Sequence, residues 1–189
     1  MKRLSALLIV MAVLSMISCA SIPAPEGAED SLVVGSFVVA FPDGFFNRPS
    51  RTFSSDIKLN FKNTTTGRKF PVFIMNGFFY FLSNGSDEYQ LESFEYASYE
   101  YGPRYSFGNP LHIEFSARPK KVLYMGAMTF SYRNPKRTNI AEAGKPVDYW
   151  HFDKYLDRTW DQEKAIDFLS GQDPETPWLT YEIERVQTE

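Results

Sequence analysis

Residues 57–82 read IKLNFKNTTTGRKFPVFIMNGFFYFL, and this stretch decides the fold class. Apolar side chains stand at every second position from Ile57 to Phe61, with Lys and Asn between them. A period of two predicts a β-strand with one buried face and one wet face. The turn signal at 64–67 separates this strand from a second apolar run at 70–74. The sequence therefore predicts a half-buried antiparallel pair.

Asn76-Gly77 follows the second of these strands. This dipeptide between apolar runs predicts a two-residue hairpin turn, because both residues tolerate positive φ. The partner strand is expected at 78–82. A further turn signal at 83–87 leads into the next strand.

Outside this stretch, four more strands are expected, at 31–41, 88–98, 111–115 and 122–132. The apolar phase slips between Leu91 and Phe94, which predicts a β-bulge. About seven strands without an intervening helix predict a mainly β domain over residues 32–133, built as an antiparallel sandwich.

The pattern changes after Tyr132, so residues 134–189 are expected to form a loop and a helical C-terminal extension. Thr159 and Gln162 fit a capping box that opens a helix, and Gly171 is a natural stop. Thr176-Pro177 predicts the start of a second short helix. The apolar residues expected on the inner faces of the two helices are Ala165, Ile166, Phe168 and Leu169, and then Trp178, Leu179, Ile183 and Val186.

The N-terminus carries an export pattern over residues 1–18. Lys2 and Arg3 precede an apolar run at 4–17, and this run is shorter than the about 20 residues that a membrane span requires. A positive start followed by a short apolar run is typical of a signal peptide that is removed.

Met16-Ile17-Ser18-Cys19 resembles the lipobox of bacterial lipoproteins. The resemblance implies that Cys19 receives a diacylglyceryl group, becomes the first residue after cleavage, and is acylated on its amine. Two or more acyl chains anchor a protein stably to a bilayer. The alternative is an ordinary secretory peptide with a chance cysteine, but Cys19 is the single cysteine of the chain.

Residues 19–31 are rich in Pro, Ala and acid, and are expected to be a lipidated tether that lifts the domain off the membrane. Ala20 after the cysteine resembles the outer-membrane sorting pattern, so an outer membrane is expected rather than an inner one.

Several motifs resemble those of the prealbumin-like (carboxypeptidase regulatory-like) β-sandwich found in bacterial surface lipoproteins. They follow one another in the order of that family and cover about residues 32–132. The family's fold is commonly a non-enzymatic binding or structural module, so the resemblance implies a sandwich without catalytic residues. The motifs are Val34-Gly35, Thr65-Thr66-Gly67, Asn76-Gly77-Phe78-Phe79-Tyr80-Phe81, Glu88-Tyr89-Gln90-Leu91 and Val122-Leu123-Tyr124-Met125-Gly126.

Composition excludes some partners and chemistries. Removal of residues 1–18 leaves 18 basic and 23 acidic residues, a net charge of −5, which argues against nucleic acid. We find no nucleophile elbow, phosphate-binding loop, dinucleotide fingerprint or metal-binding spacing. His112 and His151 are expected to have surface or packing roles. The sequence thus predicts no enzyme, no metal and no cofactor.

The most distinctive feature of the predicted domain is a Tyr-rich loop at 96–107. Tyr96, Tyr99, Tyr101 and Tyr105 can plug one end of the sandwich, or their rings can stack on a sugar or contact a protein. The leading hypothesis is a non-catalytic module of the cell envelope, held by membrane lipid and contacting another envelope protein. The alternative is a carbohydrate- or peptidoglycan-binding module that uses this loop.

Overall fold

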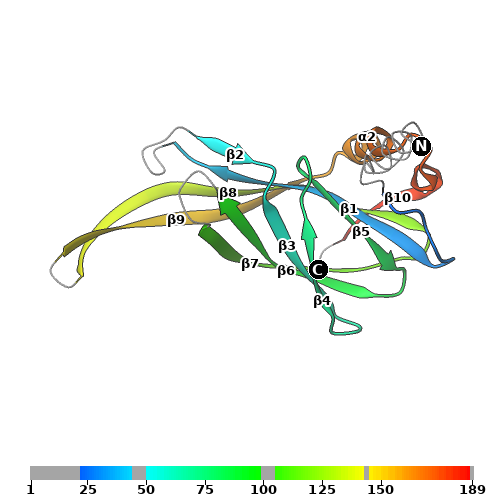
Figure 1. Cartoon of the computed structure of the whole chain (residues 1–189), viewed down its shortest axis with the longest axis horizontal. Coiled ribbons are helices and arrows are strands. Elements are labelled where there is room, and N and C mark those ends of the chain that lie inside the picture. Colours follow the sequence, from blue (N-terminus) through cyan, green and yellow to red (C-terminus); the bar gives the residue numbers. More distant parts are fainter. Residues whose placement is uncertain (1–21, 44–49, 99–104, 143–144, 188–189) are drawn as a thin grey trace, which may run out of the picture.

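The described residues fold into two stacked β-sheets, and an α-helix packs against the outer face of the six-stranded sheet (Figure 1). A computed structural model describes residues 22–43, 50–98, 105–142 and 145–187. The strands are β1 (Asp30–Phe41), β2 (Arg51–Phe53), β3 (Ile57–Asn63), β4 (Lys69–Phe73), β5 (Phe78–Asn84), β6 (Glu88–Ser98), β7 (Tyr105–Ser116), β8 (Lys121–Glu142), β9 (Lys145–Thr159) and β10 (Glu182–Arg185). The helices are α2 (Gln162–Gln172) and the 3₁₀ turn η3 (Pro177–Thr180).

Sheet A contains six strands and sheet B contains four. Sheet A has the order β10-β8-β1-β2, with β5 also paired to β1 and β9 also paired to β8. Sheet B has the order β4-β3-β6-β7. β8 runs parallel to both β1 and β10, so sheet A is mixed and the expected all-antiparallel arrangement is wrong. The mainly β, two-sheet architecture is confirmed.

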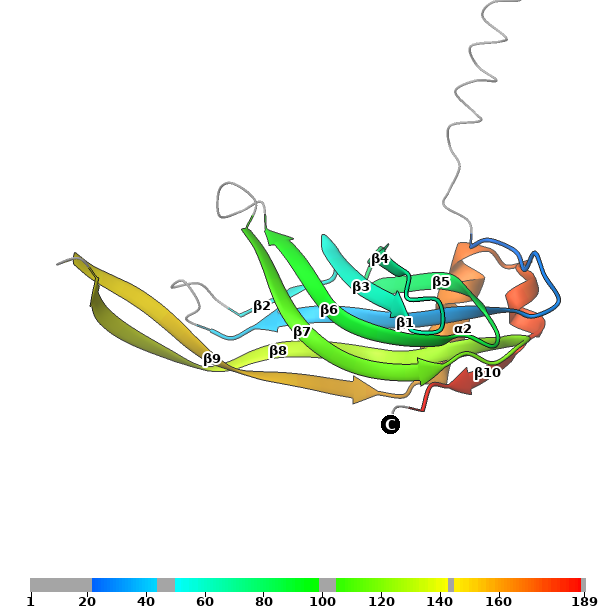
Figure 2. The ribbon, with the colours of Figure 1, turned by 90° about the horizontal axis from the view of Figure 1, so that it is seen from below.

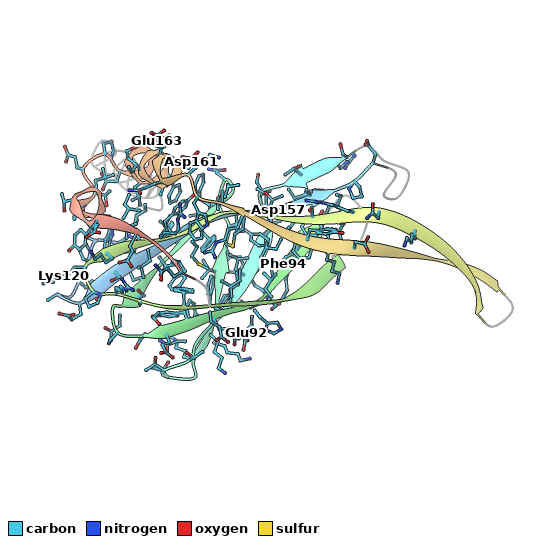
Figure 3. All side chains as sticks on the ribbon, turned by 180° about the vertical axis from the view of Figure 1, so that it is seen from behind. Glu92, Phe94, Lys120, Asp157, Asp161 and Glu163 are labelled. Atoms are coloured by element: carbon cyan, nitrogen blue, oxygen red, sulfur yellow. The ribbon has the colours of Figure 1, made fainter. Side chains whose placement is uncertain are left out.

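The main core lies between the two sheets and is built largely from aromatic rings. The Phe94 ring from sheet B lies 5.0 Å from that of Phe37 and 4.6 Å from that of Phe130, both in sheet A. Tilted and edge-to-face pairs at such distances contribute about 1 kcal/mol each beyond the area that they bury. Figure 3 shows Phe94 within this layer of side chains.

A second core covers the opposite face of sheet A at one end of the molecule. Leu32 and Val34 of β1 point into it, whereas Val33 points into the main core. All three side chains are fully buried because both faces of β1 are covered here. The near-continuous apolar run at the start of β1 is typical of a strand that is buried on both faces.

A β-bulge at Gly126 changes the face to which β8 side chains point. The register with β1 shifts by one residue between Val34 and Ser36, and Gly126 has a φ of 85°. Met125 before the bulge and Met128 after it consequently both enter the main core. The expected bulge between Leu91 and Phe94 is confirmed, because the pairing of β6 with β7 shifts register there.

The Asn76-Gly77 turn forms, but the hairpin expected around it does not. Both residues have positive φ, 53° and 84°, and Met75 and Phe78 exchange backbone hydrogen bonds of 2.8 and 3.0 Å. Beyond that single bridge the chain separates, with β4 entering sheet B and β5 entering sheet A. Local turn chemistry was correctly predicted, whereas the choice of sheet depends on long-range packing.

The described residues contain ten strands, and not the expected seven, because β2, β9 and β10 were not predicted. The loop expected after Tyr132 is wrong, since β8 continues to Glu142 and β9 returns from Lys145. Beyond Ser131 the strand partner of β8 is β9 alone within the described residues. A two-stranded ribbon that packs on no sheet needs no alternation of apolar residues, so the sequence pattern gave no signal.

The C-terminal region differs from expectation in three ways. Thr159 ends β9, so α2 starts behind Asp161, which makes no side-chain capping hydrogen bond. Ile166 is 40% exposed, although Ala165, Phe168 and Leu169 of the expected face are buried. The second expected helix is the single turn η3, followed by edge strand β10.

The molecule is elongated, with different structures at the ends of its long axis (Figures 1 and 2). The β8–β9 hairpin projects alone at one end. α2, η3 and the first described residues of the chain lie together at the other end. These two ends are the parts that sequence reasoning placed least well.

Candidate functional site

The described part of the tether expected at residues 19–31 is fixed to the domain at a few points, although most of its side chains from Pro23 to Glu29 are exposed. Cys19 lies outside the described residues, but Ile22 is 4% exposed and belongs to the second core. The indole Nε1 of Trp178, itself fully buried, donates a 2.7 Å hydrogen bond to the carbonyl oxygen of Pro23. We call residues 22–29 the strap. Its first residues are docked on η3, so they do not act as a spacer.

The rest of the strap is held by backbone hydrogen bonds. The amides of Glu26 and Gly27 donate to the Asp30 carboxylate at 2.7 and 2.6 Å. The amide of Gly85 donates to the carbonyl oxygen of Glu29 at 2.9 Å, which ties the strap to the β5–β6 turn. Side-chain acceptors for adjacent amides fix a turn in the same way as an N-cap. The strap therefore has a defined conformation from Ile22 to the start of β1.

At the opposite end, polar contacts hold the base of the β8–β9 hairpin. The Arg133 guanidinium forms an ion pair with Asp157 and lies 4.5 Å from the Tyr155 ring centroid. Asn134, with a φ of 53°, donates a 2.7 Å hydrogen bond to Asp153. The register shifts in this region, between Arg133 and Lys136. Bulges re-aim a strand and increase its twist, so this one sets the direction in which the hairpin projects.

A stack of two arginines on one tryptophan joins β9 to β10. The guanidinium carbons of Arg158 and Arg185 lie 4.0 and 4.7 Å from the Trp160 ring centroid. Arg158 Nε also donates a 2.5 Å hydrogen bond to the carbonyl oxygen of Met125 at the β8 bulge. Burial, followed by the charge of Arg185, lowers the pKa of Arg158 to about 10. The Arg158 side chain stays charged at neutral pH and attaches the C-terminal end of β9 to the sandwich.

Among the four predicted tyrosines, the structure describes the side chain of Tyr96. Tyr96 is 3% exposed, with its ring centroid 4.8 Å from that of Phe53 and 5.7 Å from that of Phe41. It is a core residue and offers no face to a ligand. Tyr99 and Tyr101 lie outside the described residues, and the Tyr105 backbone begins β7 opposite Ser98.

A polar cleft of about 330 Å³ opens where the ends of β6 and β7 approach β10. Arg118 and Glu184 form a 2.6 Å ion pair in its wall. Burial, and then the charge of Asp87, raise the pKa of Tyr89 to about 12, so its phenol is protonated at neutral pH. The lining residues are Thr64, Glu88, Tyr89, Glu114, Phe115, Ser116, Arg118, Leu123, Glu184, Arg185, Val186 and Gln187.

Three strand carboxylates take part in surface contacts on sheet B. Glu92 pairs with Lys69 and Glu95 with Lys58, each at 2.7 Å, while Glu114 accepts from Gln90 at 2.7 Å. Ion pairs at such exposed positions contribute about 0–1 kcal/mol.

The described part of the chain contains no group of three or more His, Cys, Asp or Glu side chains placed to hold a metal ion. Its helices also include none that is long and apolar enough to span a membrane. His112 is exposed on β7, and the His151 side chain lies outside the described ones.

Comparison with known proteins gives no matching family model, no matching curated protein and no matching solved structure. We therefore infer function from the geometry of this chain. Sequence reasoning missed its two most distinctive features, the docked strap and the projecting hairpin. Neither feature has a local sequence signal, because the strap depends on Trp178, 155 residues from Pro23, and the hairpin depends on the pairing of β8 with β9.

Proposed function

We propose that this chain is an exported lipoprotein, held at a bilayer by acyl chains on Cys19, that acts as a non-catalytic contact module of the cell envelope. Its β8–β9 hairpin is the contact element, and another envelope protein is the partner. Ala20 after the cysteine favours the outer membrane as its location. The prealbumin-like assignment of the sandwich is part of the same proposal and rests on the order of the sequence motifs.

One observation carries the contact role: the hairpin continues past the sandwich with no third strand on either edge. Within the described residues, β8 after Ser131 and β9 before Asp153 have only each other as strand partners. These arms are residues 132–142 and 145–152, and at about 3.3 Å per residue they make a ribbon about 30 Å long. An isolated two-stranded ribbon is at best marginally stable in water, and exposed strand edges pair readily with other chains. The presence of such a ribbon therefore favours a role in binding a partner protein.

The positions of the two ends support the same reading. The strap enters the fold beside α2, and the hairpin lies at the other end of the long axis (Figure 2). A lipid anchor placed before the strap would leave the hairpin far from the bilayer and accessible to a partner. In the polar cleft Arg118 is paired with Glu184, and Arg185 lies on the Trp160 ring, which favours a non-catalytic module.

The proposal is tested by mass spectrometry and site-specific crosslinking in intact cells. Native material is expected to begin at Cys19 and to carry the mass of three acyl chains. A photo-crosslinking amino acid at Lys136, which is exposed on the hairpin, is expected to give one discrete protein adduct. The matched control places the same amino acid at Glu114, an exposed strand position on the outer face of sheet B, where no adduct is expected.

Two results would overturn the proposal. An unmodified thiol at position 19 removes the anchor. Identical adducts at Lys136 and Glu114, or no adduct at Lys136, would show that the hairpin is not the contact element.

A further inference from the structure

We infer that the end of the domain formed by the strap, α2 and η3 lies directly against the lipid headgroups, with the β8–β9 hairpin pointing away from the membrane. This inference deepens the proposed function and rests on the acylation of Cys19 that it includes. It differs from the expectation of a short tether that lifts the domain off the membrane, because Ile22 and Pro23 are already fixed on the domain.

Chain length sets the limit. Three peptide steps separate Cys19 from Ile22, and n residues span at most about 3.6 Å × n, or about 11 Å here. Ile22 is fixed in the second core, and the next residue accepts the Trp178 indole hydrogen bond. An acylated sulfur at the membrane surface therefore holds Ile22 within about one headgroup layer of the hydrocarbon, whatever path the three residues take.

The topology then sets the direction. β8 starts at Lys121, beside Lys120, which Figure 3 shows at the same end of the molecule as Glu163 of α2. The strand has 22 residues, so it carries the chain about 70 Å from that end to Glu142 at about 3.3 Å per residue. The hairpin is thus the part of the described chain that is farthest from the anchor.

Basic residues add little attraction to lipid headgroups at the anchored end. Lys120 lies at this end (Figure 3), but its neighbours Arg118 and Lys121 are paired with Glu184 and Glu182. The strap contains Glu26 and Glu29 and no basic residue, and α2 contains Glu163 and Asp167 against Lys164. Adhesion to anionic lipid requires clusters of Lys or Arg, which these two segments lack. The short covalent link, and not electrostatic adhesion, brings this end to the bilayer.

The test measures energy transfer from a fluorophore on the protein to acceptors on lipid headgroups. The full mature acylated chain is reconstituted into phosphatidylcholine vesicles, with a single introduced cysteine labelled in each sample. Glu163→Cys places the label on α2 and Lys136→Cys places it on the hairpin; both positions are exposed. Cys19 is blocked by its acyl chain, so labelling is specific.

We expect transfer to be at least twofold higher from position 163 than from position 136. Insertion of 15 Gly/Ser residues after Ser21 adds a flexible chain with a mean extension of about 20 Å. This insertion should lower transfer from position 163 at least twofold, without changing the fold of the residues that follow.

The outcomes separate the two claims. Acylated, vesicle-bound protein with equal transfer from both positions, or with transfer from position 163 that the insertion does not change, overturns this inference and leaves the proposed function standing. Protein that carries no acyl group and stays in solution overturns both.

Discussion

Gly85 lies where three backbone segments meet. A Cβ atom at this position would stand 2.3 Å from Pro119 Cα and 2.6 Å from the carbonyl oxygen of Glu29. Both contacts are with backbone, so neither neighbour can rotate away. We expect Gly85→Ala to lower the free energy of unfolding by about 3 kcal/mol, the cost of overpacking a tight site. Urea unfolding of the mature chain carrying Cys19→Ser measures the change.

Gly171→Ala is the matched control, because a Cβ in this position of α2 meets nothing within 4 Å. Alanine is favoured over glycine in a helix, so this variant should gain about 0.5–1 kcal/mol. A loss at Gly85 no larger than the change at Gly171 would contradict the close approach of the strap to the β5–β6 turn.

Burial of the Tyr89 phenol makes the free energy of unfolding depend on alkaline pH. Its folded-state pKa is about 12, raised first by burial and then by Asp87, against 10.0 ordinarily. Between these values the unfolded chain releases a proton that the folded chain retains, so stability is complete below pH 10 and falls as pH rises toward 12. Because Tyr89 lines a cleft, water moderates the effect to about 1 kcal/mol between pH 9 and 11.

The measurement compares urea midpoints of the parent and Tyr89→Phe at pH 9 and pH 11. The variant should lose about 1 kcal/mol less than the parent. Tyr80 and Tyr124, whose pKa values burial also raises, keep some pH dependence in both proteins. Parallel pH profiles would show that the Tyr89 phenol ionises as easily in the fold as in the unfolded chain.

Helix α2 packs against the domain through one face, and this buried face is narrower than the sequence pattern predicts. The Phe168 ring stacks on that of Phe78, with centroids 4.5 Å apart and an interplanar angle of 8°. Phe168→Ala should therefore cost about 3 kcal/mol. Ile166→Ala, two residues away on the same helix but 40% exposed, should cost about 0.5 kcal/mol or less.

Thermal unfolding of the two variants and the parent provides the comparison. Equal losses from Phe168→Ala and Ile166→Ala would mean that α2 packs through the broader face predicted from its sequence. A much larger loss at Phe168 would also support the second core, to which the strap residue Ile22 contributes.

The sequence predicts elements whose residues alternate because one face meets a core. β3 is such an element, since Ile57, Leu59 and Phe61 are buried between more exposed neighbours. The sequence pattern does not predict pairing between strands that are distant in the chain. No local feature near Asn76 indicates that the two strands that flank it enter different sheets. The pattern also fails at the candidate site, because docking of the strap depends on Trp178, 155 residues from its acceptor Pro23.

At the scale of the whole molecule, the hairpin should be separable from the fold. Among the described side chains, none between Tyr132 and Trp160 belongs to or packs against the main core. Arg133 and Asp153 lie opposite each other, so a two-residue Asn-Gly turn can join them in place of residues 134–152. We expect this truncation to change the free energy of unfolding by less than about 1 kcal/mol, because a two-stranded ribbon contributes little by itself.

Met128→Ala is the control on the same strand, inside the sandwich, where the side chain is 1% exposed. Removing a buried Met costs about 2–5 kcal/mol. Urea unfolding measures the free energy of unfolding of both variants. Comparable losses would show that the hairpin stabilises the sandwich. A stable truncated protein that no longer co-purifies with the protein captured from Lys136 of the full chain would instead assign the ribbon to contact.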